Sequence, residues 1–267
     1  MSNPHHAELL SLKGADAIAF AHAQFSSNVL ALETGHWQFS AWLDPQGRVR
    51  NFFHLARVSD DRLLLLLRGG PANELADALK RFVFRSKVTL VALAPRALRT
   101  TPPMSMGTIS GADDAPHFGC GTHGLQVTDL DAADDAWRLL QLRAGWAWIP
   151  DALLNTLLSS SLALQTLQAV MIDKGCYPGQ EIVARMHFRS GYKKHLCHVE
   201  LSHAEIAGEI LRTNEQENGR LIDVVDNGQS FEALAVLTDD FAASATNEKL
   251  PPTDHGLIMR ILETWPA

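Results

Sequence analysis

The segment KGCYPGQEIVAR, from Lys174 to Arg185, brings several residue types that can do chemistry into one short stretch. Two glycines and a proline predict a tight loop at its start, and EIVARMHF beyond them has the apolar spacing of a helix. Cys176 would then lie just ahead of the free amide groups and the positive end of the helix dipole, with Lys174 beside it and Arg185 within a couple of helical turns. Because each of these neighbours favours thiolate over thiol, the segment predicts an activated cysteine.

The other polar residues of this segment have more than one possible use. Glu181 precedes Arg185 by four residues, a spacing that permits an ion pair on the helix surface, and the same carboxylate could instead reach a ligand. Gln180 could bond the loop or a bound molecule, and the glycines would let the backbone approach a flat partner. A lone cysteine is also commonly a small buried apolar residue, so from the residues alone a functional and a structural thiol both stay open.

The elements that must position this loop begin with an α+β half. AELLSLKG predicts a strand, Asp16 can cap the helix after it, and residues 44–47 (DPQG) predict the turn of a β-hairpin. DRLLLLL and KVTLVAL predict two more strands, on either side of a helix expected over residues 71–85. These are the ingredients of a ferredoxin-like layer, with helices packed on one face of a sheet.

The rest of the chain predicts two further parts. Residues 94–121 are rich in Pro, Gly, Ser, Thr and Asp, as in a linker or long loop, and a helix is expected within 131–150 before the cysteine segment. After Lys194, short alternating segments divided by turns predict a small β-barrel or sandwich. We therefore expect a first α+β domain over 1–95, a second α+β segment over 96–194 that carries the cysteine loop, and a C-terminal β-barrel over 195–267.

Composition narrows the class of protein. An apolar content of 46% with 20% charged residues indicates an ordinary soluble globular protein, and without a membrane-length apolar run or a signal segment we expect a cytoplasmic protein with no membrane partner. Three widely spaced cysteines argue against a disulfide framework. A net charge of −7 argues against holding nucleic acid by bulk electrostatics, so we expect no direct nucleic-acid partner.

The cysteine segment resembles the K-G-C-[FY]-x-G-Q-E-x-x-[AS]-R signature of the YgfZ-type folate-binding proteins, a branch of the glycine-cleavage T-protein superfamily. The positions that match it with the correct spacing are Lys174, Gly175, Cys176, Tyr177, Gly179, Gln180, Glu181, Ala184 and Arg185. AWLDPQGRV (41–49), LKRFVFRSKVTL (79–90) and LLQLRAGWAWIP (139–150) also resemble segments of that family. Two stretches depart from it: 21–29 matches the cavity-lining segment only in part, at Gln24, Ser27 and Asn28, and 161–170 lacks the carboxylate that relatives carry.

The resemblance implies a fold and a role. The fold is two intertwined ferredoxin-like, T-protein-type α+β domains around a central cavity, plus a small C-terminal β-barrel. The role is to bind tetrahydrofolate or a derivative in that cavity and to assist the assembly or repair of iron–sulfur enzymes, with an indirect effect on tRNA methylthiolation. Partners would be iron–sulfur enzymes or cluster-assembly proteins, and no stable metal is expected. Cys176 would be the functional thiol with Lys174 beside it, and the folate contacts would come from Gly175, Tyr177, Gly179, Gln180, Glu181 and Arg185.

Other functions are less favoured by the sequence. A tetrahydrofolate-dependent aminomethyltransferase of the T-protein type needs a carboxylate near the pterin, and T-proteins proper lack the cysteine signature, so we favour a non-enzymatic accessory role. A cysteine hydrolase or transferase with His187 as its base lacks a hydrolase pattern around Cys176.

Two further groups of residues invite a functional interpretation. Without zinc-type spacing, ordinary strand or loop roles are favoured for His195, Cys197, His198 and His203, and for Cys120 and His123. A second group could bind folate glutamates, RNA or an acidic partner, but half of it falls on the helix expected over 71–85, which favours a solvated helix face. The second group is Lys80, Arg81, Arg85, Lys87, Arg96 and Arg99.

Overall fold

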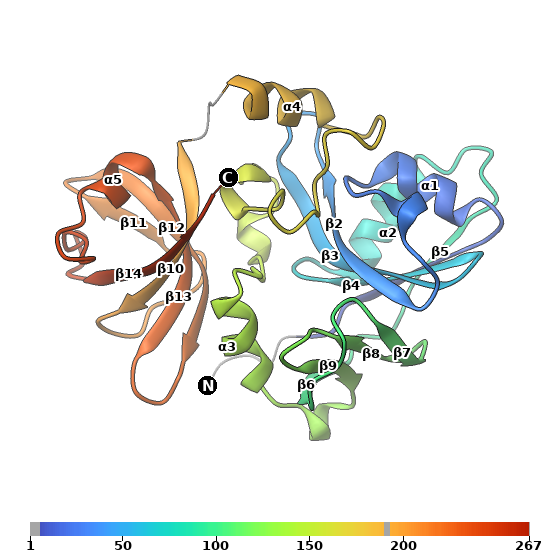
Figure 1. Cartoon of the computed structure of the whole chain (residues 1–267), viewed down its shortest axis with the longest axis horizontal. Helices are drawn as coiled ribbons and strands as arrows, with labels where there is room; N and C mark the ends of the chain where they lie inside the picture. Colours follow the sequence, from blue (N-terminus) through green and yellow to red (C-terminus); the bar gives the residue numbers. More distant parts are fainter. Residues whose placement is uncertain (1–5, 190–192, 267) are drawn as a thin grey trace.

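The computed structural model describes residues 6–189 and 193–266, and it has a mixed α and β architecture built on three antiparallel sheets (Figure 1). The first sheet has five strands in the order β2-β3-β4-β1-β5. Their bounds are β1 Leu9–Lys13, β2 His36–Leu43, β3 Val49–Ser59, β4 Arg62–Leu67 and β5 Thr89–Ala92. The expected α+β class is confirmed. Within the described residues, none of the helices is long and apolar enough to cross a membrane.

The first sheet is buried on both faces. Helices α1 (Ala17–Gln24) and α2 (Ala72–Lys80) cover one face, where Leu63, Leu65 and Leu67 of β4 join their core. The alternate residues Leu64 and Leu66 belong to the core on the opposite face. Because successive side chains of a strand point to opposite faces, the run of five leucines is the pattern of a strand covered on both sides.

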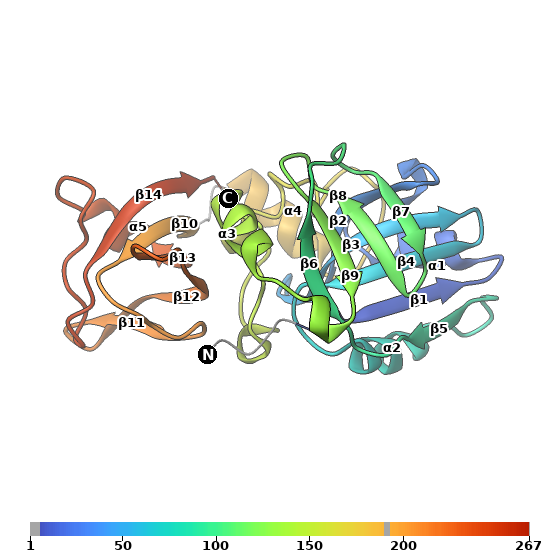
Figure 2. The same cartoon turned by 90° about the horizontal axis from the view of Figure 1, so that it is seen from below.

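The second sheet lies against that opposite face (Figures 1 and 2). Its order is β6-β9-β8-β7, with bounds β6 Ala97–Thr101, β7 Ile109–Ala112, β8 Ala115–Gly119 and β9 Gly124–Thr128. Three of these strands lie within 94–121, so the prediction of a linker there is wrong. The glycines of this stretch serve tight packing: a Cβ on Gly119 would lie 2.1 Å from the carbonyl oxygen of Ser105.

The chain then returns from the second sheet to the first. After α3 (Ala136–Arg143), the amide of Ile149 donates to the carbonyl of Arg68 at 2.8 Å. Further on, the Ser26 hydroxyl donates to the carbonyl of Ala169 at 2.7 Å. The segment that leads to the cysteine loop is therefore built onto the first sheet, and it ends in α4 (Gln180–Arg189).

The C-terminal part is a five-stranded antiparallel sheet in the order β11-β12-β13-β10-β14. The bounds are β10 Lys194–Leu201, β11 Ile210–Thr213, β12 Gln216–Asp226, β13 Phe231–Thr238 and β14 Met259–Trp265, with the short helix α5 at Asp239–Ala243. Pairing between described residues leaves β11 and β14 as the two edges, so these strands form an open sheet rather than the closed barrel that was expected. Leu250 and Leu257, from the irregular segment before β14, complete its core.

Two ion pairs join α3 to this C-terminal sheet. Arg138 donates to Asp223 at 2.7 Å, and both side chains are buried. Arg143 donates through Nε to Glu232 at 2.9 Å, and His198 Nε2 lies 2.7 Å from the same carboxylate.

The three expected domain ranges each contain one sheet, although residues 1–5, 190–192 and 267 of those ranges lie outside the described residues.

Two local predictions need correction. Asp16 does not cap α1 through its side chain; its carboxylate accepts instead from the backbone amide of Lys87 at 2.6 Å, which ties the start of α1 to the strand entering the sheet beside it. The helix expected over 71–85 ends at Lys80, so Phe82 lies beyond it and is 44% exposed.

Candidate functional site

The cysteine segment forms a loop that leads directly into a helix. Residues 175–179 have no helix or strand, and α4 begins at Gln180. The amide of Gln180 donates to the carbonyl of Tyr177 at 3.2 Å, and the amide of Val183 donates to the carbonyl of Gly179 at 3.1 Å. The predicted loop at a helix start is thereby confirmed.

Gly179 is where this loop crosses the β2–β3 hairpin. Its φ is +82°, and a Cβ there would lie 2.4 Å from the carbonyl oxygen of Asp44 and 3.1 Å from the Cα of Gly47. On the hairpin side, a Cβ on Gly47 would lie 3.3 Å from Ile182. Only a residue without a side chain allows the two backbones to approach this closely, so the glycine is needed for docking the loop.

Lys174 supplies a buried cation beside the thiol. It is only 7% exposed, its Nζ donates to the carbonyl of His22, and the same nitrogen lies 5.0 Å from the ring centroid of Tyr177. Burial lowers the pKa of Lys174 to about 8, while the nearby charge of Cys176 acts in the opposite direction. At neutral pH the amine still carries its proton, so a positive charge lies beside the thiol.

Cys176 itself is exposed to solvent. The preceding Gly175 has φ +96°, and the nearest atom to a Cβ placed on it is the Nε2 of His22, at 4.0 Å. A reaction partner can therefore reach the thiol, whereas His22, which the sequence did not connect with this loop, lies on its inner side. Burial and the charge of Lys174 lower the pKa of His22, so its imidazole is neutral at physiological pH.

The remaining signature residues divide into two groups. Tyr177 is buried and its hydroxyl donates to the carbonyl of Met171 at 2.8 Å, while Gln180 Nε2 donates to the carbonyl of Ile172 at 3.1 Å. These polar groups hold the loop to the segment before it. Glu181 and Arg185 are exposed on α4, and among the ion pairs of the described residues there is none between them, so both charges face solvent.

An aromatic cavity of about 380 Å³ adjoins this loop. Met171, whose carbonyl accepts from Tyr177, lines it, and the amide side chains of Gln38 and Gln168 provide polar groups. The full lining is Trp37, Gln38, Phe39, Met106, Gly107, Trp146, Thr166, Leu167, Gln168 and Met171. Several aromatic rings with a few polar groups suit a flat heteroaromatic ligand.

The stretch that matched the family only in part lies beside this cavity. Gln38 Nε2 donates to the hydroxyl of Ser27 at 2.7 Å and to the carbonyl of Asn28 at 3.2 Å, and the Ser27 hydroxyl bonds Ser40 at 2.7 Å. Gln24 has a buried side-chain oxygen that no group of the described residues bonds. The segment 21–29 thus supports the cavity wall through Gln38.

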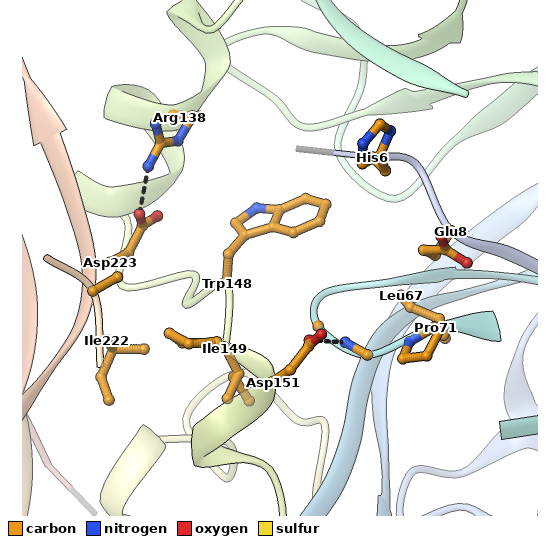
Figure 3. Close-up of a pocket in the computed structure, with 14 residues that line it drawn as sticks. His6, Glu8, Leu67, Pro71, Arg138, Trp148, Ile149, Asp151, Ile222 and Asp223 are labelled. Carbon is orange, nitrogen blue, oxygen red and sulfur yellow. Dashed lines mark hydrogen bonds and ion pairs between the residues drawn. The ribbon is translucent and has the colours of Figure 1, made fainter. Parts of the chain in front are cut away.

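A second cavity of about 380 Å³ lies where the first sheet, α3 and the C-terminal sheet meet. Figure 3 shows Trp148 between the Arg138–Asp223 pair on one side and His6 and Glu8 on the other. Its carboxylates are engaged in the walls: Asp151 accepts from the amide of Gly70 and Glu8 from the amide of Ala72, both at 2.9 Å. We therefore regard it as the joint between the three parts. Met171, which links the aromatic cavity to the cysteine loop, is not among its lining residues.

The two alternative clusters do not assemble. In the first pair, the thiol of Cys120 donates to the carbonyl of Phe118 at 3.6 Å, and His123 Nε2 lies 3.2 Å from the side-chain nitrogen of Gln141. The second cluster is equally divided. His195 pairs with Asp239 at 2.6 Å, His198 with Glu232, and the thiol of Cys197 contacts Thr264 at 3.6 Å, so these side chains have separate partners. In the part of the chain that the structure describes, no three metal-ligating side chains gather. His187 is exposed on α4, where its ring packs on Phe188.

The three thiols should differ strongly in reactivity. Iodoacetamide at pH 7.5 should label Cys176 at least about a hundredfold faster than Cys120 or Cys197, because burial raises the pKa of Cys120 to about 12, raises that of Cys197, and shields both sulfurs. Mass spectrometry of timed, quenched samples measures the three rates. In denaturant all three should react alike, and equal labelling of Cys120 and Cys176 in the folded protein would contradict the assignment.

Comparisons with known proteins agree with this architecture. No family model matches the chain. It is 24% identical to "tRNA-modifying protein YgfZ" of Sodalis glossinidius, covering 89% of this chain and 84% of that one, and 25% identical to the protein of the same name from Aliivibrio fischeri, covering 87% and 83%. It is also 26% identical to an "Uncharacterized protein" of Haemophilus influenzae, covering 82% of each chain.

The fold has a solved relative. The glycine cleavage system aminomethyltransferase T from Bartonella henselae superposes with a TM-score of 0.72 over 96% of this chain and 82% of that one, at 13% sequence identity. The resemblance carried by the cysteine signature is thus confirmed along nearly the whole chain. The chain is a sequence relative of the YgfZ-type proteins, and it has the fold of the glycine-cleavage T-protein.

Proposed function

We propose that this chain is a cytoplasmic folate-binding accessory protein that assists the assembly or repair of iron–sulfur enzymes and thereby affects tRNA modification, with Cys176 as its working thiol. The observation that carries the proposal is the exposed Cys176 on a loop that buries the amine of Lys174 next to it and adjoins an aromatic cavity. Two of the relatives are named as tRNA-modifying proteins, which supports the link to tRNA modification.

We further propose that tetrahydrofolate or a derivative occupies the aromatic cavity. The flat pterin suits walls built from Trp37, Phe39 and Trp146. The amide of Gln168 can donate to and accept from its ring edge, while Gln38, whose Nε2 is bonded to Ser27 and Asn28, offers its oxygen as an acceptor. Folate would supply a one-carbon carrier next to the thiol.

The signature residues would contribute in different ways. Glu181 and Arg185, both exposed, would contact the ligand or a partner directly, and Gly175 keeps the approach to Cys176 open. Tyr177, Gly179 and Gln180 would act through the loop, because their contacts are with neighbouring backbone. Three functional units with boundaries near residues 95 and 194 remain our proposal for the domain organisation.

An aminomethyltransferase on the same fold is the alternative. It would need a carboxylate at the pterin, and the ten residues that line the aromatic cavity include none. The likeness to the Bartonella henselae enzyme supports the fold and leaves the chemistry open. Release of ammonia from an aminomethylated carrier protein in the presence of tetrahydrofolate would favour this alternative.

Folate binding can be tested at the mouth of the cavity. Tetrahydrofolate should quench tryptophan emission, since Trp37 and Trp146 line the cavity, and Met106→Glu should weaken its binding about tenfold, because a carboxylate at the rim repels the anionic glutamate tail. Fluorescence titration and calorimetry measure both constants. Leu130→Glu, which adds the same charge at another exposed apolar residue, is the matched control. Absence of binding, or an equal effect of the two substitutions, would reject this site.

A further inference from the structure

The turn after α2 holds two phenylalanine rings in solvent. α2 ends at Lys80 and residues 81–85 form turns; in them Phe84 is 96% exposed and Phe82 is 44% exposed. Val83, between them, packs against the core under the helices. Phe82 is partly covered by an edge-on contact with Trp42, at 6.3 Å between ring centroids, whereas the ring of Phe84 is left almost wholly free.

The backbone of this turn is strained at the more exposed ring. Phe84 has φ +40°, in the left-handed region that a bulky side chain seldom adopts. Strained backbone that persists at an exposed position is commonly associated with a binding site. With 96% of its surface exposed, Phe84 has little contact within the described residues to offset this strain, so a partner that covered the ring would stabilise the turn.

Positive charge surrounds the rings. Arg81, Arg85 and Lys87 are all exposed, and the ion pairs among described residues include none of the three. Lys80 pairs with Asp77 at 2.7 Å. Only Lys80 of the basic group lies on α2, so the cations of the turn are solvated, as expected from the sequence, but they do not lie on a helix face. In a chain of net charge −7 they form a local positive surface.

A hollow of about 390 Å³ lies next to Phe82. Its lining includes two guanidinium donors, Arg50 and Arg81, and two carboxylate acceptors, Glu74 and Asp77. The guanidinium of Arg50 lies 4.5 Å over the ring of Trp42, and its Nε donates to Asn155 at 3.2 Å. A ligand that both accepts and donates hydrogen bonds, and that also carries a flat ring, would match the hollow and the turn together.

We propose that this surface, residues 81–87 with the hollow beside Phe82, binds a single-stranded segment of RNA. Bases stack on the open faces of Phe84 and Phe82, phosphates contact the cations of the turn, and the carboxylates of the hollow accept from ribose 2′-hydroxyls, which DNA lacks. An acidic protein segment would neutralise the cations but would leave the ring of Phe84 uncovered and would meet the carboxylates of the hollow. None of these residues belongs to the cysteine loop or the aromatic cavity, so the inference does not rest on the proposed function.

The test is a binding titration with the full chain. The anisotropy of a fluorescein-labelled 12-nucleotide RNA of mixed sequence should rise at low salt, and Phe84→Ala should weaken binding about tenfold through the loss of a stacked base. Arg81→Glu combined with Arg85→Glu should weaken it further and flatten its salt dependence. Phe188→Ala, which removes another ring of 76% exposure on α4, is the matched control and should leave affinity unchanged.

Several results would overturn the proposal. If the RNA does not bind at low salt, or if it binds the Phe84→Ala variant as tightly as the wild type, the proposed binding surface is rejected. If a DNA strand of the same sequence binds equally well, the 2′-hydroxyls have no role, and RNA is rejected as the specific occupant. A 12-residue Glu-rich peptide that binds in place of RNA assigns the surface to an acidic protein. Since the ring of Phe84 is almost wholly exposed, its truncation should leave thermal unfolding unchanged, which checks that the variant is folded.

Discussion

Cells that lack their own homologue of this chain should recover iron–sulfur enzyme activity and tRNA methylthiolation when given the wild-type protein, and should stay at the background level when given Cys176→Ala. The reason is that, in the proposed function, the exposed thiol of Cys176 is the reactive group, and the alanine variant removes it. Enzyme assays and mass spectrometry of digested tRNA, in matched cultures with equal protein levels, measure the effect.

The same variant also separates chemistry from folding. Because Cys176 is exposed, its replacement by alanine should change the free energy of unfolding by less than about 0.5 kcal/mol and tetrahydrofolate affinity by less than about twofold. Equal rescue by the variant and the wild type would reduce the thiol to a structural role. A well-expressed wild-type protein that gives no rescue would reject the iron–sulfur role, whether or not folate binds.

The cysteine loop was predictable from sequence because its backbone demands are strict. Gly179 must approach the hairpin turn within a distance that no Cβ allows, and the turn itself was readable from its Asp-Pro-Gln-Gly composition. The signature therefore marks local geometry. The neighbour on the inner side of the loop, His22, comes from α1, and no local pattern could have paired two segments about 150 residues apart.

The second sheet was missed because its composition imitates a linker. Pro, Gly, Ser and Thr dominate 94–121, yet Leu98 and Phe118 are fully buried, and the glycines serve turns and close packing between short strands. Short strands with few apolar residues show only a weak alternation of polar and apolar side chains, so the loop-like composition decided the prediction.

The burial of Arg68 could not be predicted from the neighbouring sequence. A charged residue directly after five leucines suggests the exposed end of a strand, but Arg68 is fully buried, donates to the carbonyls of Ala147 and Trp146 and to Gln141, and stacks on Trp148 at 4.5 Å. Burial lowers its pKa to about 9. Its acceptors come from a segment about 75 residues further along the chain, so only the tertiary structure explains why a guanidinium is tolerated there.

Replacement of Glu232 by glutamine should destabilise the protein by about 3 kcal/mol at pH 7, or lower its melting temperature by about 9 °C. Glu232 is 4% exposed and accepts from Arg143 on α3, from Asn227, and from His198 on the neighbouring strand. Glutamine keeps the size of the side chain but leaves Arg143 without its counter-charge, at the joint between α3 and the C-terminal sheet. Calorimetry or tryptophan-detected unfolding in urea measures the difference.

The pH dependence of that difference follows from the same contacts. The hydrogen bond from Arg143 is the largest of the effects that lower the pKa of Glu232, from 4.5 to about 2. Its stabilising contribution is therefore fully present above about pH 4.5 and is lost as the pH falls toward 2, so the stabilities of the wild type and Glu232→Gln should converge in that window. Glu217→Gln is the matched control: its carboxylate pairs with Arg220 but is 34% exposed, and its loss should cost less than about 1 kcal/mol. A gap between wild type and Glu232→Gln that persists unchanged at pH 2.5 would show that packing, and not the ion pair, holds α3 to the C-terminal sheet.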